Sequence, residues 1–351
     1  MSWWIVADLI TQKAIRKPRL IGRQINNLQR VAMSVHEKFS TIRQDLSTSI
    51  IGQSTLVDRL LIALLADGHL LVEGAPGLAK TRAVKELASC VDGVFQRIQF
   101  TPDLLPADIT GTEIYLPASG EFKFQPGPLF NQIVLADEIN RAPAKVQSAL
   151  LEAMAERQIS VGQQTYPLSE LFMVMATQNP IEQEGTYSLP EAQLDRFLMH
   201  VTIDYPPARN ELEILRLVRS ENAGTAHTYR DASQQLNIDD IRQAREEVNR
   251  VYLTEQIEEY LVRLVTETRD KAGPQARHIA FGASPRGTIS LDACARAHAW
   301  LNGQDYVAPA DIHAVIHDVL RHRILLTYEA EADGISASQV IDQLLSQVAV
   351  P

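Results

Sequence analysis

Residues 74–81 read Gly74-Ala75-Pro76-Gly77-Leu78-Ala79-Lys80-Thr81 and directly follow the apolar run 69–73. Glycines let a backbone fold its N–H groups around phosphate oxygens, and the helix expected next adds the positive end of its dipole. Lys80 would reach the β- and γ-phosphates, and the Thr81 hydroxyl would bind Mg²⁺. Arg82, the next residue, is included in this predicted nucleotide site. The alternative interpretation is a glycine-rich turn in a plain α/β domain.

Ala79 stands where such a loop usually has its last glycine. Alanine accepts helical backbone angles, so we expect the loop to tolerate it with a slightly tighter fit. The sequence therefore still predicts a phosphate-binding loop between a strand and a helix.

Polar residues follow two later predicted strands, at 132–136 and 171–176. Asp137, after the run 132–136, would hold Mg²⁺ through water, and Glu138 would act as the general base for the attacking water. An acid pair at a strand end is often only solvated, so the phosphate loop upstream is what favours this role. Asn179, in Thr177-Gln178-Asn179-Pro180, would touch the γ-phosphate or orient the water, although Asn-Pro is also a turn signal.

Five apolar runs predict a sheet. They lie at 69–73, 95–100, 132–136, 171–176 and 198–203. Most are continuously apolar, which is typical of strands buried on both faces of a parallel sheet. The segments between them are long enough for crossover helices, and a helix over 142–157 is predicted with Pro143 in its first turn. We therefore expect a five-stranded α/β/α layer.

The chain after Pro206 and Pro207 is predicted to be helical throughout. Residues 255–268 place their apolar side chains on one face, and 284–303 begin with the helix-start pair Ser-Pro. We expect three parts: a basic N-terminal extension over 1–33, a nucleotide-binding core over 34–206 and a helical domain over 207–351.

Composition excludes several classes of protein. The 351 residues are 45% hydrophobic and 22% charged, which argues against a largely disordered chain. Two cysteines cannot form a disulfide scaffold or a four-cysteine zinc site, and they suggest a reducing cytoplasm. No apolar run reaches the roughly 18 residues of a membrane span. The net charge of −10 makes a nucleic-acid partner unexpected.

The first 32 residues differ from the rest in charge. They contain six Lys or Arg residues against Asp8 alone, a net charge of +5. A basic, acid-poor segment suits a membrane-surface or nucleic-acid arm. Because clean amphipathic periodicity is missing, we favour an unstructured extension, with Met33 as a candidate start of the protein.

Five motifs, in this order, resemble those of the MoxR family of AAA+ ATPases. They are residues 74–81, Ala136-Asp137-Glu138-Ile139-Asn140-Arg141-Ala142-Pro143, Thr177-Gln178-Asn179-Pro180, Leu189-Pro190-Glu191-Ala192-Gln193-Leu194-Asp195-Arg196-Phe197 and Gly282-Ala283-Ser284-Pro285-Arg286-Gly287. The resemblance covers about residues 34–325. It implies a P-loop AAA+ αβα sandwich with a five-stranded parallel sheet, followed by an all-α lid domain.

The resemblance also implies an activity. Such proteins hydrolyse ATP with Mg²⁺ in homo-oligomeric rings, often hexamers, and remodel or assemble other proteins, often with a partner that has a von Willebrand factor A domain. Arg196 would be the arginine finger that reaches the neighbour's γ-phosphate. Arg286 would be a second sensor on ATP of its own chain, and Gln53, in Ile51-Gly52-Gln53, would line the adenine pocket. Arg141 is a further candidate for an intersubunit contact.

Two insertions are predicted to be hairpins, over 110–128 and 159–167. The first contains Tyr115, Phe122 and Phe124, which would either grip a substrate or pack under the lid. Three other functions stay open: a nucleotide-switched scaffold with little hydrolysis, a nucleic-acid motor, and a chelatase-like motor subunit.

Overall fold

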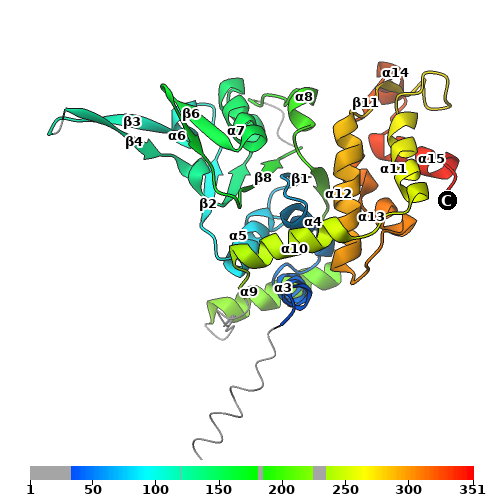
Figure 1. Ribbon diagram of the computed structural model, residues 1–351, viewed down its shortest axis with the longest axis horizontal. Coiled ribbons are helices and arrows are strands. Elements are labelled where there is room, and N and C mark those ends of the chain that lie inside the picture. The colour runs from blue at the N-terminus through cyan, green and yellow to red at the C-terminus, as the bar shows by residue number, and fades with distance from the viewer. Residues whose placement is uncertain (1–32, 119, 181–184, 224–234) are drawn as a thin grey trace, which may run out of the picture.

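Five parallel strands form the central sheet of the computed structural model, which describes residues 33–118, 120–180, 185–223 and 235–351. Their order across the sheet is β2-β5-β8-β1-β9 (Figure 1). They span Leu70–Gly74 (β1), Phe95–Gln99 (β2), Ile133–Asp137 (β5), Met173–Gln178 (β8) and Met199–Ile203 (β9). All five predicted strands are thereby confirmed, with small shifts at their ends. The basic segment 1–32 lies outside the described residues.

The sheet separates two hydrophobic cores. Leu70 and Val72 of β1 point into the larger core, whereas Leu71 points into the smaller one. The larger core takes in helices α3 (Val35–Ser49), α4 (Ser54–Leu65) and α5 (Lys80–Cys90), and the smaller one α7 (Ala144–Glu156). Both faces of the sheet are covered, which explains why most of its strands are continuously apolar. Helix α7 begins two residues later than expected, because Pro143 is its N-cap rather than part of its first turn.

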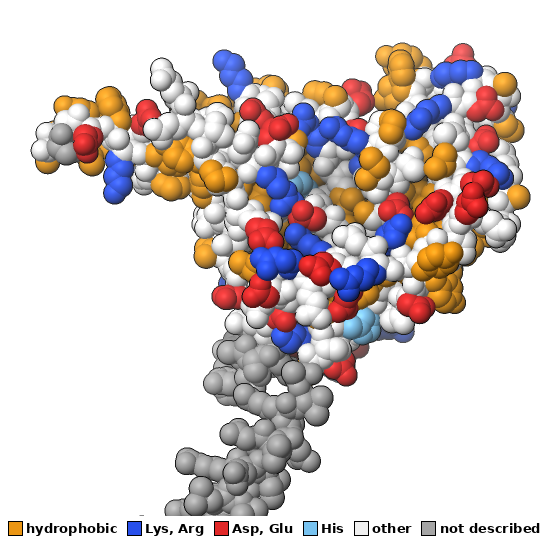
Figure 2. All heavy atoms as spheres, viewed as in Figure 1, with side chains coloured by type: hydrophobic (Ala, Val, Ile, Leu, Met, Phe, Trp, Pro, Cys, Tyr) orange, Lys and Arg blue, Asp and Glu red, His pale blue; other side chains and the backbone are white. Residues whose placement is uncertain are grey.

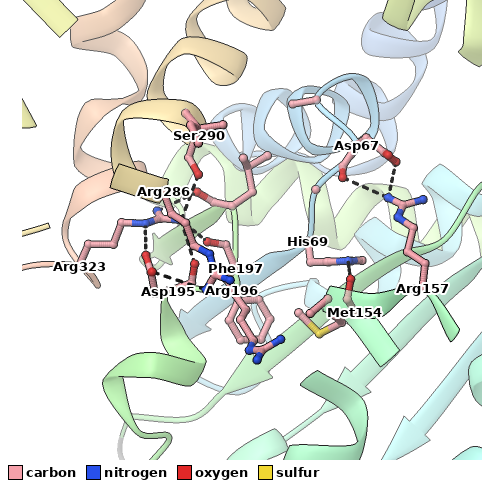
Figure 3. Close-up of a pocket in the computed structure, with 15 residues that line it drawn as sticks. Asp67, His69, Met154, Arg157, Asp195, Arg196, Phe197, Arg286, Ser290 and Arg323 are labelled. Carbon is pink, nitrogen blue, oxygen red and sulfur yellow. Dashed lines mark hydrogen bonds and ion pairs between the residues drawn. The ribbon is translucent and has the colours of Figure 1, made fainter. Parts of the chain in front are cut away.

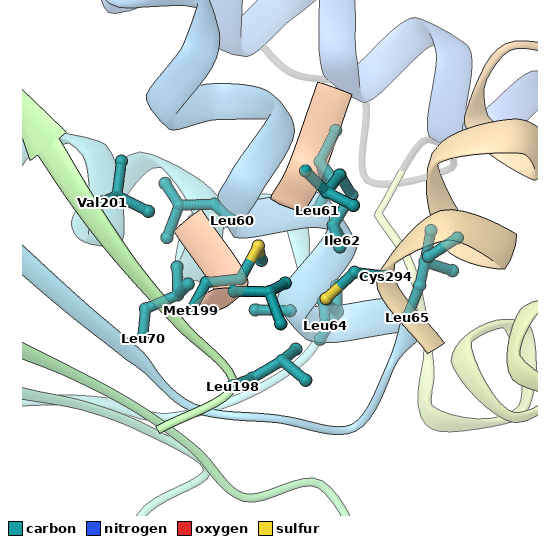
Figure 4. Packing of buried hydrophobic residues seen from close by; sticks show 14 of the residues in the cluster. Leu60, Leu61, Ile62, Leu64, Leu65, Leu70, Leu198, Met199, Val201 and Cys294 are labelled. Atoms are coloured by element: carbon teal, nitrogen blue, oxygen red, sulfur yellow. The ribbon is translucent and has the colours of Figure 1, made fainter. Parts of the chain in front are cut away.

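The C-terminal part of the chain is mostly helical. Its helices are α9 (Ala208–Asn222), α10 (Ile238–Arg250), α11 (Glu255–Glu267), α12 (Pro285–Leu301), α13 (Pro309–Leu320), α14 (Tyr328–Ala332) and α15 (Ala337–Gln347). The larger core continues into five of them: α10, α11, α12, α13 and α15. Figure 4 shows Cys294 of α12 packed with side chains of α4 and β9; burial raises the pKa of its thiol to about 12. The predicted helices at 255–268 and 284–303 are confirmed. No helix in the described ranges is long and apolar enough to cross a membrane.

One element of the helical part was not predicted. Strands β10 (Ile279–Phe281) and β11 (Leu325–Leu326) form a short antiparallel pair between the helices. They are too short to give the alternating pattern by which a strand is recognised in a sequence.

Both insertions are hairpins, as predicted. Strands β3 (Gly111–Leu116) and β4 (Glu121–Pro126) form one, and β6 (Gln158–Val161) and β7 (Gln164–Pro167) form the other. Short helix α6 (Pro106–Thr110) leads into the first hairpin, which projects from the molecule with hydrophobic side chains along it (Figure 2).

The aromatic residues of the first hairpin do not pack under the lid. The hairpin lies on the far side of the sheet from α11, α13 and α15 (Figure 1). Tyr115 and Phe122 are 52% and 68% exposed, whereas Phe124 stacks on Tyr166 of the second hairpin with ring centroids 4.1 Å apart. The two hairpins therefore support each other and leave two aromatic rings in solvent.

Candidate functional site

The phosphate loop connects β1 to α5, as the sequence predicts. Gly77 has φ +85°, and a Cβ built there would meet nothing within 4 Å, so the surface of the loop is open to a ligand. The expectation for Ala79 is corrected: it adopts left-handed angles, φ +60° and ψ +17°, rather than helical ones. Ala79 is the N-cap of α5, and a left-handed residue there turns the chain from the loop into the helix. This is a conformation that glycine adopts without a steric cost.

Lys80 begins α5 and points back over the loop. Its Nζ donates to the carbonyl oxygens of Gly74 at 2.7 Å and Gln178 at 3.4 Å. Burial lowers the pKa of Lys80, and the nearby charges of Asp137 and Glu138 partly oppose this effect. The ammonium group is thus held at the meeting point of β1, β8 and the loop.

A pocket of about 380 Å³ lies beside Lys80 and brings most of the predicted site together. It is lined by Pro76, Gly77, Leu78, Ala79, Lys80, Thr81, Arg82, Asp137, Glu138 and Asn179. The carboxyl ends of β1, β5 and β8 meet here because these parallel strands are direct neighbours. Gly74 and Ala75 lead into the loop at the end of β1 without lining the pocket.

The carboxylate of Asp137 is buried and held by two partners. Thr177 Oγ1 donates to Oδ1 at 2.5 Å, and Arg97 of β2 binds Oδ2 through Nη2 at 2.7 Å and Nε at 3.0 Å. The Thr177 hydroxyl also accepts from the backbone N–H of Glu138 at 2.9 Å. Thr177 therefore fixes both acidic residues relative to β8.

Glu138 has a left-handed backbone, with φ +58°. Its Oε2 accepts from Gln99 Nε2 at 2.9 Å and forms an ion pair with Arg141 Nε at 3.0 Å. Arg141 thus contacts the predicted general base of its own chain.

A small apolar pocket adjoins the phosphate loop. It has a volume of about 80 Å³ and is lined by Ser49, Ile50, Ile51, Gln53, Gly77, Leu78, Ala79, Arg82, Pro206, Ile214 and Leu217. Gln53 is buried, and its Nε2 donates to the carbonyl oxygen of Asp204 at 2.8 Å. Arg82 lines both pockets and pairs with Glu221 of α9 at 2.5 Å. The predicted adenine-binding segment therefore lies directly beside the predicted phosphate site.

Arg196 and Arg286 line a different pocket, of about 360 Å³, which shares no residue with the phosphate-loop pocket (Figure 3). Arg196 donates to the carbonyl oxygen of Leu151 at 3.3 Å. Within the described ranges, no carboxylate forms an ion pair with Arg196, whereas Arg286 lies 3.8 Å from Asp195. Arg286 thus lies outside the lining of the phosphate-loop pocket of its own chain, and the start of α12, which carries it, is bound to Asp195. Its contact with the ATP of its own chain stays a prediction.

The residues that line the phosphate-loop pocket fit ATP with Mg²⁺. Backbone N–H groups at the start of α5 and the Lys80 ammonium suit phosphate oxygens. The Thr81 hydroxyl and the Asp137 carboxylate are oxygen ligands of the kind that Mg²⁺ prefers. The apolar side chains around Gln53 suit the flat face of a base.

Several residues of the site were missed in the sequence. Thr177 lies two residues before Asn179 in the motif Thr177-Gln178-Asn179-Pro180, from which only Asn179 was predicted to act. Arg97 and Gln99 alternate with buried Ile98 along β2, and this alternation of polar and apolar residues is a signal that was available. Because β2 pairs with β5 in register 99 to 137, polar residues of β2 lie beside the acidic pair.

Comparisons with known proteins agree on the protein family that this chain resembles. A family model described as "ATPase family associated with various cellular activities (AAA)" matches residues 69–199, and one described as "AAA lid domain" matches residues 273–344. Chaperone MoxR1 of Mycobacterium tuberculosis is 48% identical over 306 residues, 86% of this chain and 79% of that protein. Protein MoxR of Paracoccus denitrificans is 31% identical over 332 residues, 90% of this chain and 97% of that protein. A crystal structure of a Cytophaga hutchinsonii protein described as an ATPase has a TM-score of 0.81 and 44% identity, covering 95% of this chain and 99% of that one.

Proposed function

Because the chain belongs to the MoxR family of AAA+ ATPases, we propose that it hydrolyses ATP between the subunits of a ring and uses the cycle to remodel partner proteins. One observation supports this proposal above all. The phosphate-loop pocket contains a lysine, two carboxylates and an amide, whereas Arg196 and Arg286 lie together in a separate pocket. A composite site, with phosphates on one subunit and arginines from the next, uses both pockets.

Each residue of the phosphate-loop pocket has a role in this proposal. The loop backbone and Lys80 bind the phosphates, and the Gln53 segment holds the base. Thr81 and Asp137 hold Mg²⁺, which neutralises charge on the phosphates when it is bound. Glu138 accepts a proton from the attacking water, and Asn179 orients that water.

Arg196 and Arg286 both act on the nucleotide of the neighbouring subunit. Arginine stabilises the charge that develops on a transferred phosphoryl group, and such a residue supplied by a partner can raise turnover by roughly 10³–10⁵-fold. The 360 Å³ pocket presents both side chains on one face of the chain. Arg286 is therefore proposed to act in trans, beside Arg196.

The broader assignments follow from the family. We propose a hexameric ring, with residues 34–206 as its nucleotide-binding core and 207–351 as its lid. A protein with a von Willebrand factor A domain is the proposed partner, and the relative named a chaperone supports an assembly role. The two cysteines are free and buried, which suits the reducing cytoplasm.

A nucleotide-switched scaffold is the second candidate function. It is favoured by Glu138, whose carboxylate is engaged by Gln99 and Arg141. A general base in such contacts must be released before it can accept a proton. Turnover would then be slow until a partner binds.

Two substitutions in the same pocket test the proposal. Glu138→Gln keeps the shape of the site but removes the base, so we expect ATP binding to persist and turnover to fall by roughly 10²-fold or more. Lys80→Ala should lose binding as well. Binding is measured with a fluorescent ATP analogue and turnover by phosphate release. Unchanged turnover in Glu138→Gln would contradict the assignment of the base; wild-type turnover at the Lys80→Ala level, with ATP bound, would favour the scaffold.

A further inference from the structure

Asp195, directly before the proposed arginine finger, connects the two parts of the chain. Its Oδ1 accepts from Arg323 Nε at 2.8 Å, and its Oδ2 accepts from the Ser284 hydroxyl at 2.9 Å. Arg323 and Ser284 both belong to the helical part, whereas Asp195 follows α8 (Glu191–Leu194) of the core. One carboxylate therefore binds two elements of the lid (Figure 3).

Arg323 is almost completely buried, with 2% of its side chain exposed. Its guanidinium also donates to the carbonyl oxygens of Phe197 at 2.7 Å and Leu198 at 3.1 Å, and to Ser290 Oγ at 3.1 Å. The carbonyl contacts lie directly after Arg196 in the chain. Burial lowers the pKa of Arg323, and the charge of Asp195 opposes this. Arg323 thus binds the chain on both sides of Arg196, at Asp195 before it and at Phe197 and Leu198 after it.

Ser284 is the N-cap of α12. Its Oγ accepts from the backbone N–H of Arg286 at 3.1 Å while its hydroxyl hydrogen is donated to Asp195. A single hydroxyl therefore ties the first turn of α12, which carries Arg286, to the residue before Arg196. Arg286 is further attracted to the same carboxylate across 3.8 Å.

We propose that Asp195, held by Arg323 and Ser284, is a positioning residue that fixes Arg196 and Arg286 relative to each other as one unit. This inference rests on the proposed function, because the unit matters only if both arginines act on a neighbour's nucleotide. A misplacement of about 1 Å in a catalytic group can cost roughly 10²-fold in rate. A movement of the lid would displace both arginines together, so lid position would set the activity of the adjacent subunit's site.

The first test uses Asp195→Asn, which keeps the size of the side chain and removes its charge. We expect kcat to fall about tenfold or more with little change in ATP affinity, because the phosphate-loop pocket of the same chain is untouched. If Asp195→Asn instead damaged the nucleotide site of its own chain, ATP binding would weaken. Unchanged kcat would overturn the inference.

Mixed rings separate a defect in trans from a general one. Lys80→Ala subunits have correctly placed arginines but no working phosphate site. Asp195→Asn subunits have a working phosphate site but misplaced arginines. A mixture of the two should hydrolyse ATP faster than the mean of the two separate rates. A mixture of Arg196→Ala with Lys80→Ala is the control, and its failure to recover activity would reject the composite site itself. Recovery in the control without recovery for Asp195→Asn would reject only the positioning role.

A second pair of variants covers the case in which Asp195→Asn does not fold. Ser284→Gly keeps an acceptable N-cap residue but removes the hydroxyl that binds Asp195, whereas Ser284→Thr keeps it. We expect kcat to fall in Ser284→Gly and to be restored in Ser284→Thr, at similar melting temperatures. Equal kcat in both variants would contradict the proposal.

Discussion

Ala79 shows how a single backbone angle shapes the phosphate loop. A residue with a Cβ in the left-handed region pays about 1–2 kcal/mol relative to its usual conformation. Ala79 takes up this strain at φ +60°, at the N-cap position where the loop turns into α5. Backbone strain of this kind is common where a chain must present its N–H groups to a ligand.

Ala79→Gly is therefore expected to be neutral or to stabilise the protein by up to about 1 kcal/mol, since relief of strain slightly exceeds the extra freedom of the unfolded chain. Ala293→Gly, in the middle of α12, is the matched control and should destabilise by about 1 kcal/mol. Denaturant unfolding measures both variants. Equal destabilisation by the two substitutions would contradict the strained conformation.

His69 gives a prediction about acid stability. Its Nδ1 accepts from the backbone N–H of Val174 at 3.0 Å, so the hydrogen is on Nε2, which lies 3.3 Å from the Met154 carbonyl oxygen. Burial lowers its pKa to about 4 from 6.5. The folded state thus disfavours the charged ring. The contribution of neutral His69 to stability is complete above pH 6.5 and is lost as the pH falls toward 4.

When the pH falls from 7 to 5, protonation of His69 in the unfolded state should lower the free energy of unfolding by about 2 kcal/mol. His69→Gln cannot titrate and serves as the control. We expect the drop in stability over this interval, measured by guanidinium unfolding, to be smaller in the variant by that amount. The same drop in both proteins would show that His69 is not the cause.

Local sequence predicted the residues of the phosphate-loop pocket well. Local patterns place these residues in one pocket: a glycine-rich turn follows a strand, and polar residues stand at the ends of neighbouring strands. Arg286 was harder, because its place depends on how α12 docks against Asp195, a contact between positions 89 residues apart. The left-handed backbone conformation of Ala79 was not predicted either. Alanine ordinarily prefers right-handed helical angles, and no local pattern indicates the exception.

The two hairpins show that an element can be predicted while its packing is not. Their turn glycines and alternating residues mark them in the sequence. Their mutual support could not be predicted, because the stacking of Phe124 on Tyr166 joins separate insertions. An isolated hairpin of two strands is only marginally stable in water, so this contact matters for the projecting arm.

Phe124→Ala should therefore destabilise the protein by about 1–3 kcal/mol, through lost burial and lost ring stacking. Phe122→Ala, on the same strand but 68% exposed, should change stability by less than about 0.5 kcal/mol. Thermal unfolding of the two variants tests this difference. A larger effect at Phe122 would show that the solvent-facing ring packs against another part of the chain.

At the scale of the whole molecule, the essential feature is the separation of the two pockets. The phosphate-loop pocket lies at the carboxyl ends of β1, β5 and β8, whereas Arg196 and Arg286 lie where the core meets α12. The five-stranded sheet could be predicted from its apolar runs. The separation could not, because it depends on the docking of the helical part, which no local pattern encodes.

The most direct test of the shared site is steady-state ATP hydrolysis per subunit over a wide range of protein concentration. We expect the rate to rise with concentration in the wild type and to fall to the Lys80→Ala background in Arg196→Ala. Arg242→Ala, which removes an exposed arginine paired with Glu170, should behave as the wild type. A rate per subunit that is independent of concentration and unaffected by Arg196→Ala would contradict a site completed by a neighbouring subunit.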